Sequence, residues 1–298
     1  MERLAHGYTL VEGPVWVPGR GLVFSDVHDG GVYCLGLDGT VSTVFPYRRG
    51  IGGMALHENN GMVVGGRNIS FKSFAGGDTV VLLDRDPDNG NFGYNDLTTD
   101  AAGRIYAGSL GSPVFEEGEQ IPGDLHLIDL DGTSRVVATD IVLTNGLGFS
   151  PDGGTLYHAD SRRQTVFRYA VAEDGSLGEK LPFASVEVGS PDGLAVSEDG
   201  AVWLAVAGGG GVRVFEPDGR LREHVATPVP MCTSVCFGGA DLCDLYVVTG
   251  SVGTGGEREG SVYCMRTDVA GLSVPPARVR TVRVQQRMGL SGRNVAEE

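Results

Sequence analysis

The stretch "NGLGFSPDGGTLYHAD", residues 145–160, follows the same pattern as "DGLAVSEDGAVWLAVA", residues 192–207. Each begins with a polar residue and a glycine, runs through an apolar segment, turns around Asp-Gly and enters a second apolar segment. Two short apolar segments joined by such a turn are typical of a β-hairpin. The pattern also raises a question, because a strand that is otherwise apolar begins with Asn145 in one copy and Asp192 in the other.

The same pattern occurs six times along the chain, at intervals of roughly 40 to 50 residues, a period that is typical of propeller blades. Several copies continue into a third and a fourth apolar segment, as in "GDLHLIDLDGTSRVVA", residues 123–138. Two hairpins per repeat would form one four-stranded antiparallel sheet. We therefore expect an all-β protein folded as a six-bladed β-propeller. Its blades begin near these positions: 12, 53, 95, 145, 192 and 233.

The composition agrees with a fold made of short strands and tight turns. The 298 residues include 48 glycines, and 41% of the residues are hydrophobic. We expect residues 1–284 to form a single domain and residues 285–298 to be a disordered tail. A terminal strand must close the ring of blades. Two segments are candidates for it, "GYTLVEG" at 7–13 and "ARVRTVRV" at 277–284, and the sequence does not decide between them.

The charge and the cysteines restrict the partners and the compartment. A formal net charge of −15 disfavours binding to nucleic acids and to anionic lipid surfaces. No apolar run is long enough to cross a membrane, and the N-terminus has no signal-peptide core. An odd number of cysteines, five, suits a reducing compartment. These features predict a soluble cytoplasmic protein and leave its oligomeric state open.

The polar residues at the starts of the repeats are expected to form a ring, because the first strand of each propeller blade lines the central tunnel. Glu12 and Asp192 would repel each other there unless a cation lay between them. Carboxylate and amide oxygens suit Ca²⁺, Mg²⁺ or Mn²⁺, whereas Zn²⁺ is less expected without His or Cys ligands. We therefore expect one divalent ion, with Ca²⁺ preferred, although Asn-Gly and Asp-Gly are also ordinary turn sequences. The ring positions are Glu12, Gly53, Asn95, Asn145, Asp192 and Thr233.

Several of these segments also resemble a known family. "EGPVW" at 12–16, "NGLGFSPDGGTLYHAD" at 145–160 and "PDGLAV" at 191–196 carry the resemblance. The family joins senescence marker protein (regucalcin), gluconolactonase and luciferin-regenerating enzyme, and the resemblance covers nearly the whole chain. It implies a six-bladed propeller that hydrolyses small lactones by means of a divalent metal ion.

The resemblance also implies roles for individual residues. Glu12, Asn145 and Asp192 match the metal ligands of the family, and Asp192 matches the proposed general base. Asn95 matches a residue that contacts the substrate or the metal. The sugar lactonases of the family carry an arginine where this chain has Gly93, which leaves sugar specificity open. Further residues expected near the pocket are Tyr94 and Arg67, as substrate contacts, and His28, Asn68 and His158, each of which has a purely structural alternative.

Three functions fit these residues. The first is a lactonase, a carboxylic ester hydrolase in which the cation polarises the carbonyl group and either Asp192 or a hydroxide held by the cation activates the water. The second is a phosphotriesterase or an esterase that uses the same metal site on a less polar substrate. The third is a metal-binding propeller without catalysis. A serine hydrolase is disfavoured, because no Gly-x-Ser-x-Gly motif occurs.

Overall fold

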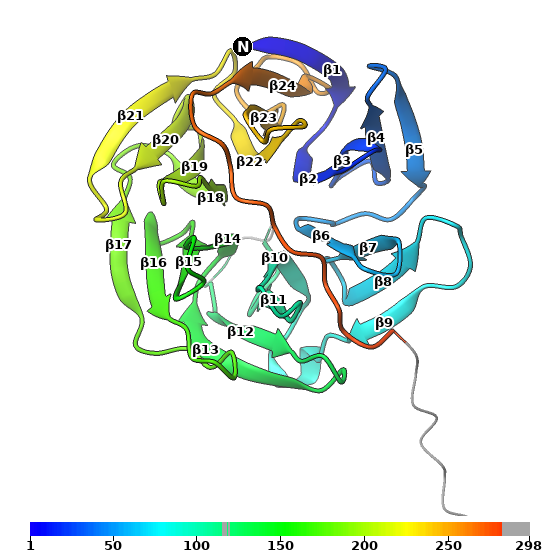
Figure 1. Ribbon diagram of the computed structural model, residues 1–298, viewed down its shortest axis with the longest axis vertical. Coiled ribbons are helices and arrows are strands. Elements are labelled where there is room, and N and C mark those ends of the chain that lie inside the picture. Colours follow the sequence, from blue (N-terminus) through cyan, green and yellow to red (C-terminus); the bar gives the residue numbers. More distant parts are fainter. Residues whose placement is uncertain (115–117, 119, 282–298) are drawn as a thin grey trace, which may run out of the picture.

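The strands of the protein form six antiparallel sheets of four strands each, arranged around a common axis (Figure 1). This computed structural model describes residues 1–114, 118 and 120–281, and the expected tail at 285–298 lies outside the described residues. The predicted six-bladed propeller is confirmed. The only helix in the described part is a three-residue 3₁₀ turn at Pro87–Asn89, so no helix there is long and apolar enough to cross a membrane.

The first five blades each consist of four strands that are consecutive in the chain. The first blade contains β2 (Val11–Val17), β3 (Gly21–Asp26), β4 (Val32–Gly36) and β5 (Val41–Phe45). The second contains β6 (Met54–His57), β7 (Gly61–Val64), β8 (Ile69–Ser73) and β9 (Val80–Leu83). The third contains β10 (Tyr94–Thr99), β11 (Ile105–Ser109), β12 (Gly123–Ile128) and β13 (Ser134–Ile141). The fourth contains β14 (Thr144–Phe149), β15 (Thr155–Asp160), β16 (Thr165–Ala170) and β17 (Leu181–Ser185). The fifth contains β18 (Ser190–Val196), β19 (Val202–Ala207), β20 (Gly211–Phe215) and β21 (Leu221–Ala226).

The sixth blade joins the two ends of the chain. Its strands β22 (Cys232–Gly238), β23 (Asp244–Thr249) and β24 (Gly260–Arg266) are completed by β1 (Glu2–Tyr8), which pairs antiparallel with β24. The closing strand is therefore N-terminal. Only two residues of the candidate segment 7–13 belong to it, because Val11 already begins the inner strand of the first blade.

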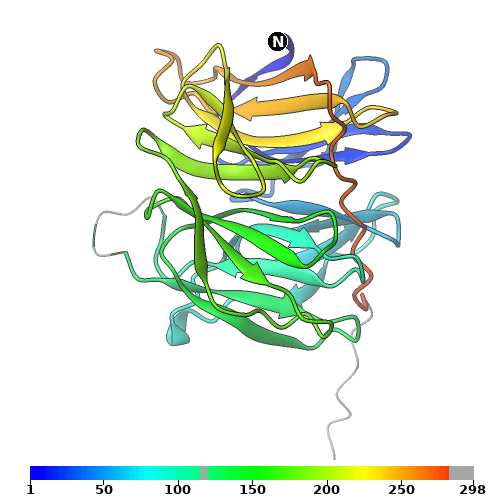
Figure 2. The same cartoon turned by 60° about the vertical axis from the view of Figure 1, so that its left-hand side comes forward.

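The prediction that residues 277–284 close the ring is wrong for residues 277–281, the part of this segment that the structure describes. Residues 277–281 form no strand of the six sheets, apart from one isolated parallel bridge between Ala277 and His57, and the segment 269–281 crosses one face of the propeller (Figure 1, orange). The Ala277 N–H donates a hydrogen bond to the Leu56 carbonyl, and the Arg278 N–H donates one to the Gly103 carbonyl. Figure 2 shows this segment running along one side of the molecule, past the ends of the strands.

The hydrophobic core consists of six clusters, each packed between two neighbouring blades. The middle strands are therefore covered on both faces, and every residue of β3, β7 and β11 is buried. Outer strands such as β5 and β21 are largely exposed to solvent. This explains why the repeats carry continuous apolar runs in their second segments and polar residues in their fourth.

The first strand of each blade is the innermost, as predicted. Each inner strand contacts the next, in the order β2, β6, β10, β14, β18, β22 and back to β2. All six begin within two residues of the predicted positions. The C-terminal segment crosses near the far ends of β6 and β18, whereas the predicted polar ring lies at the beginnings of the inner strands.

Candidate functional site

The inner strands are irregular at the ring. In β10, Tyr94 pairs with Ser109 and Leu97 pairs with Ala107, so that Asn95 and Asp96 together oppose a single residue of β11. The pairing of β14 and β18 shifts in the same way, at Asn145-Gly146 and at Asp192-Gly193. Such a β-bulge breaks the alternation of side chains and redirects them. It allows polar groups to face the tunnel from strands that otherwise pack on both sides.

In the Asn145-Gly146 and Asp192-Gly193 pairs, the second residue is glycine because the neighbouring inner strand lies directly against its Cα atom. A Cβ atom on Gly146 would lie 2.4 Å from the backbone nitrogen of Leu194. A Cβ atom on Gly193 would lie 2.0 Å from the hydroxyl of Ser234. The Asn-Gly and Asp-Gly pairs are therefore not hairpin turns. They are places where one inner strand comes very close to the next.

A chain of hydrogen bonds links the amides of the ring across three blades. The Asn95 side chain donates to Oδ1 of Asn145 over 2.7 Å and to the Thr144 carbonyl over 2.8 Å. Nδ2 of Asn145 donates to the Ser161 hydroxyl over 2.7 Å, and that hydroxyl donates to the carbonyl of Pro191 over 2.5 Å. Pro191 directly precedes Asp192. The orientation of the Asn145 amide is thus fixed from both sides.

Three carboxyl groups at the ring have raised pKa values. Burial raises the pKa of Glu12 well above its usual range, and repulsion from Asp192 and Asp96 raises it further. Burial and the charge of Asp96 likewise raise the pKa of Asp192. Burial raises the pKa of Asp96 to about 7. No cationic group is among the causes in any of the three, so negative charge accumulates here without compensation from the described side chains.

Four of the six predicted ring residues interact in pairs: Asn95 donates a hydrogen bond to Asn145, and Glu12 lies close enough to Asp192 for their charges to repel. The structure adds one residue that the sequence analysis missed. Thr233 is not available, because its buried hydroxyl donates to the Val11 carbonyl over 2.6 Å. Gly53 has no side chain to contribute. The missed residue is Asp96, which follows Asn95 in the sequence. A regular strand would point it away from the tunnel, so only the bulge reveals its position.

The flanking candidates lie in different environments. Tyr94 is buried in the core between blades, and its hydroxyl donates to the Asp84 carbonyl over 3.0 Å. His158 is buried behind β14, where it contacts the Thr144 hydroxyl at 2.7 Å. Asn68 accepts hydrogen bonds from Arg48. These three side chains are all engaged in hydrogen bonds within the protein.

Two other flanking candidates are exposed. His28 lies between β3 and β4, and Arg67 lies in the loop between β7 and β8. With the described residues Arg67 forms no hydrogen bond or ion pair.

Gly93 and Arg67 are neighbours across the second and third blades. Gly93 has a φ of +148°, a backbone conformation that L side chains rarely adopt. A Cβ atom there would lie 2.9 Å from the Gly66 carbonyl oxygen and 3.6 Å from the Cα atom of Arg67. The backbone therefore has a physical reason to keep glycine at this position, and the nearest arginine comes from the adjacent blade.

The oxygen atoms of Glu12, Asn145 and Asp192 are the groups that could hold a cation. Among the described residues, no three His, Cys, Asp or Glu side chains are close enough to form a metal site by themselves. An ion at the ring would therefore depend on an amide oxygen together with two carboxylates. Amide and carboxylate oxygens together are a donor set that suits Ca²⁺.

Comparison with known proteins identifies the family of this chain. The sequence profile described as "SMP-30/Gluconolactonase/LRE-like region" matches residues 10–251. The chain belongs to this family. Proteins with similar sequences include a 6-deoxy-6-sulfogluconolactonase from Pseudomonas putida, 32% identical over 278 residues, with 89% of this chain and 94% of that protein covered.

One further sequence relative and one solved structure agree with this assignment. Regucalcin from Gallus gallus is 30% identical over 268 residues, which cover 83% of this chain and 85% of that protein. The solved structure of a gluconolactonase from Xanthomonas campestris is 27% identical and superimposes with a TM-score of 0.75, covering 88% of this chain and 89% of that one. The family resemblance expected from the sequence is thus confirmed.

Proposed function

We propose that this protein is a lactonase that depends on a divalent metal ion. The observation that carries the proposal is the approach of two carboxyl groups, the half-buried Glu12 and the buried Asp192, to the fixed amide of Asn145. Membership of the SMP-30/gluconolactonase/LRE-like family supports the reaction class, since similar proteins are named as lactone-hydrolysing enzymes.

The residues at the ring fit a divalent cation. Burial raises the pKa values of Glu12 and Asp192, and repulsion from neighbouring carboxylates raises them further. A bound cation would oppose both effects, because it favours the charged form of each carboxyl group. Glu12, Asn145 and Asp192 would hold the ion, and Ca²⁺ suits their hard oxygen atoms best. When bound, the ion would polarise the ester carbonyl and stabilise the negative charge that develops on its oxygen.

Asp192 is the proposed proton acceptor. A water molecule attacks the carbonyl carbon of the lactone while one carboxylate oxygen of Asp192 takes a proton from that water. The bond between the carbonyl carbon and the ring oxygen then breaks, and the proton passes from Asp192 to the ring oxygen. The product is a hydroxy acid, and the carboxylate of Asp192 is regenerated.

Asn95 and Arg67 are the proposed substrate contacts. Asn95 lies beside Asn145 at the ring, and its carboxamide can present an oxygen atom to a substrate while its nitrogen holds Asn145. Arg67 is exposed and uncommitted next to Gly93, so its guanidinium can donate hydrogen bonds to substrate oxygens. Tyr94 was expected to contact the substrate, but its position in the core supports a different role. We propose that it anchors the beginning of β10.

The proposal is tested by hydrolysis assays on metal-depleted protein. δ-Gluconolactone, an unsubstituted δ-lactone and a phosphotriester are offered with and without Ca²⁺, Mg²⁺, Mn²⁺ or Zn²⁺. We expect lactone hydrolysis that requires the ion and is lost in Asp192→Asn. Arg67→Gln should raise KM for the sugar lactone with little change in kcat, since Arg67 binds and does not react.

The same assay distinguishes the alternatives. Turnover of the phosphotriester alone would favour a phosphotriesterase that uses the same metal site. Binding of the ion without turnover of any ester would favour a non-catalytic propeller.

A further inference from the structure

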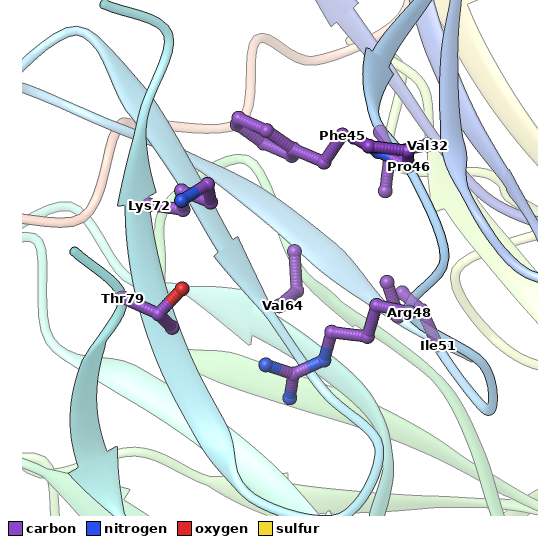
Figure 3. Close-up of a pocket in the computed structure, with 8 residues that line it drawn as sticks. All are labelled: Val32, Phe45, Pro46, Arg48, Ile51, Val64, Lys72 and Thr79. Atoms are coloured by element: carbon purple, nitrogen blue, oxygen red, sulfur yellow. The ribbon is translucent and has the colours of Figure 1, made fainter. Parts of the chain in front are cut away.

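A cavity of about 300 Å³ lies between the first and second blades (Figure 3). Its walls come from β4, β5, β7 and β8 and from the segments that join β5 to β6 and β8 to β9, and no residue of the polar ring lines it. A volume of about 300 Å³ is at the lower end of the range for small-molecule sites. The cavity is therefore a candidate ligand site separate from the ring.

Most of the cavity wall is apolar. Phe45, Ile51 and Val64 line it and belong to the hydrophobic cluster between the two blades. In Figure 3, Val64 lies between Lys72 on one side and Arg48 on the other. A ligand here would place an apolar body against these side chains.

Arg48 brings a positive charge to this wall without an acidic partner. Its guanidinium donates to the hydroxyl of Ser70 over 2.7 Å, to the carbonyls of Gly65 and Asn68 over 2.9 and 2.8 Å, and to the Asn68 side chain over 3.0 Å. All of these acceptors are neutral, and no carboxylate in the described part of the chain forms an ion pair with Arg48. A half-buried charge of this kind favours an anion nearby.

Lys72 brings a second positive charge that is also unpaired. Its ammonium group donates to the Gly77 carbonyl over 2.7 Å, and no carboxylate of the described residues pairs with it. The only other lysine of the chain, Lys180, pairs with Asp140 at 2.8 Å. The protein carries 38 acidic and 23 basic side chains, yet two basic ones line this cavity and no acidic one does.

We propose that this cavity binds a small monocarboxylate with an apolar body. The carboxylate lies between Arg48 and Lys72, whose N–H groups complete its hydrogen bonds, and the apolar part packs on Val64 and Phe45. An anion without an apolar part would leave these walls exposed to water, and a neutral apolar molecule would leave the two charges unpaired. The polar ring cannot serve as this site, because its carboxyl groups repel a carboxylate.

The proposal is tested by calorimetric titration of the full chain with benzoate and with hexanoate, and with benzamide as the uncharged reference. We expect at least one carboxylate to bind at one site per chain and benzamide to bind more weakly. Lys72→Gln keeps the stem of the side chain and should weaken binding roughly tenfold through loss of one charged hydrogen bond. The matched control Lys180→Gln removes the same charge elsewhere and should leave the affinity unchanged.

A second variant and a spectroscopic readout locate the ligand. Thr79 lines the cavity and is exposed, so Thr79→Phe should fill the cavity without disturbing the fold and should abolish binding. In the unmodified protein, the methyl signals of Ile51 and Val64 should shift as benzoate or hexanoate is added. The proposal is overturned if neither carboxylate binds saturably, or if both variants bind as well as the unmodified protein.

Discussion

The side-chain amide of Asn95 donates a hydrogen bond to Oδ1 of Asn145 over 2.7 Å and joins the inner strands of the third and fourth blades. The two residues are separated by one complete blade in the sequence. They meet because equivalent positions of neighbouring repeats converge on the propeller axis. The bond fixes the direction in which the single side-chain oxygen of Asn145 points.

Asn95→Ala should weaken Ca²⁺ binding without abolishing it. The substitution frees the Asn145 amide to rotate, although Asn145 keeps its bond to Ser161. Asn145→Ala removes a proposed ligand and should weaken binding more. Calorimetric titration of metal-depleted protein measures both affinities. If Asn95→Ala weakened binding as much as Asn145→Ala, Asn95 would itself be a ligand.

Asp96→Asn should stabilise the metal-free protein at pH 8. Burial raises the pKa of Asp96 to about 7 in the folded state, above that of an unfolded chain, so the charged group opposes folding at high pH. The gain should reach up to about 4 kcal/mol at pH 8 and shrink as the pH falls from about 7 to about 4, because the folded protein then takes up the proton. Urea unfolding in the presence of a chelator measures it. A gain that grew on acidification would contradict the environment described for Asp96.

Gly146→Ala should distort the ring. The new Cβ atom would lie 2.4 Å from the Leu194 nitrogen and 2.6 Å from the Asp192 carbonyl oxygen, and backbone atoms cannot yield easily. We expect a loss of about 1–3 kcal/mol in the free energy of unfolding, together with weaker Ca²⁺ binding. Gly154→Ala is the control, because its Cβ atom would meet nothing closer than 3.4 Å. Equal effects of the two substitutions would mean that the inner strands do not touch at Gly146.

His158 should make the protein less stable in acid. Burial lowers the pKa of His158 to about 4, below that of an unfolded chain, so the unfolded chain binds the proton first as the pH falls. Relative to His158→Gln, the wild-type protein should lose about 3 kcal/mol of stability between pH 6.5 and pH 4. Unfolding curves of both proteins across this range give the difference. A difference that did not change with pH would indicate that His158 is solvated.

The sequence alone was sufficient to predict the blades and most of the ring. Apolar runs and Asp-Gly turns are local signals, and six repeats of them imply a closed propeller in which Glu12, Asn145 and Asp192 converge. Asp96 could not be predicted, because a regular strand would direct it away from Asn95. The bulge that places it in the ring depends on pairing with β11.

The closure of the ring and the cavity between the first two blades also depend on contacts that the sequence does not display. The strand pairing of Glu2 with Cys264 spans nearly the whole chain, and either terminus carried a plausible pattern for it. Arg48 lies in an irregular segment between two blades, where no repeat indicates the direction of its side chain. The four neutral oxygen atoms that accept its hydrogen bonds come from three residues, and only the folded structure brings them together.

We propose above all that Glu12, Asn145 and Asp192 hold one divalent cation. Titration of metal-depleted protein with Ca²⁺, followed by calorimetry, tests it most directly when the unmodified chain and Asp192→Asn are compared. We expect one ion per unmodified chain and an affinity at least about tenfold lower in the variant, through loss of one charged ligand. If the unmodified chain bound no ion, or if Asp192→Asn bound it equally well, the assignment of the ring as a metal site would be wrong.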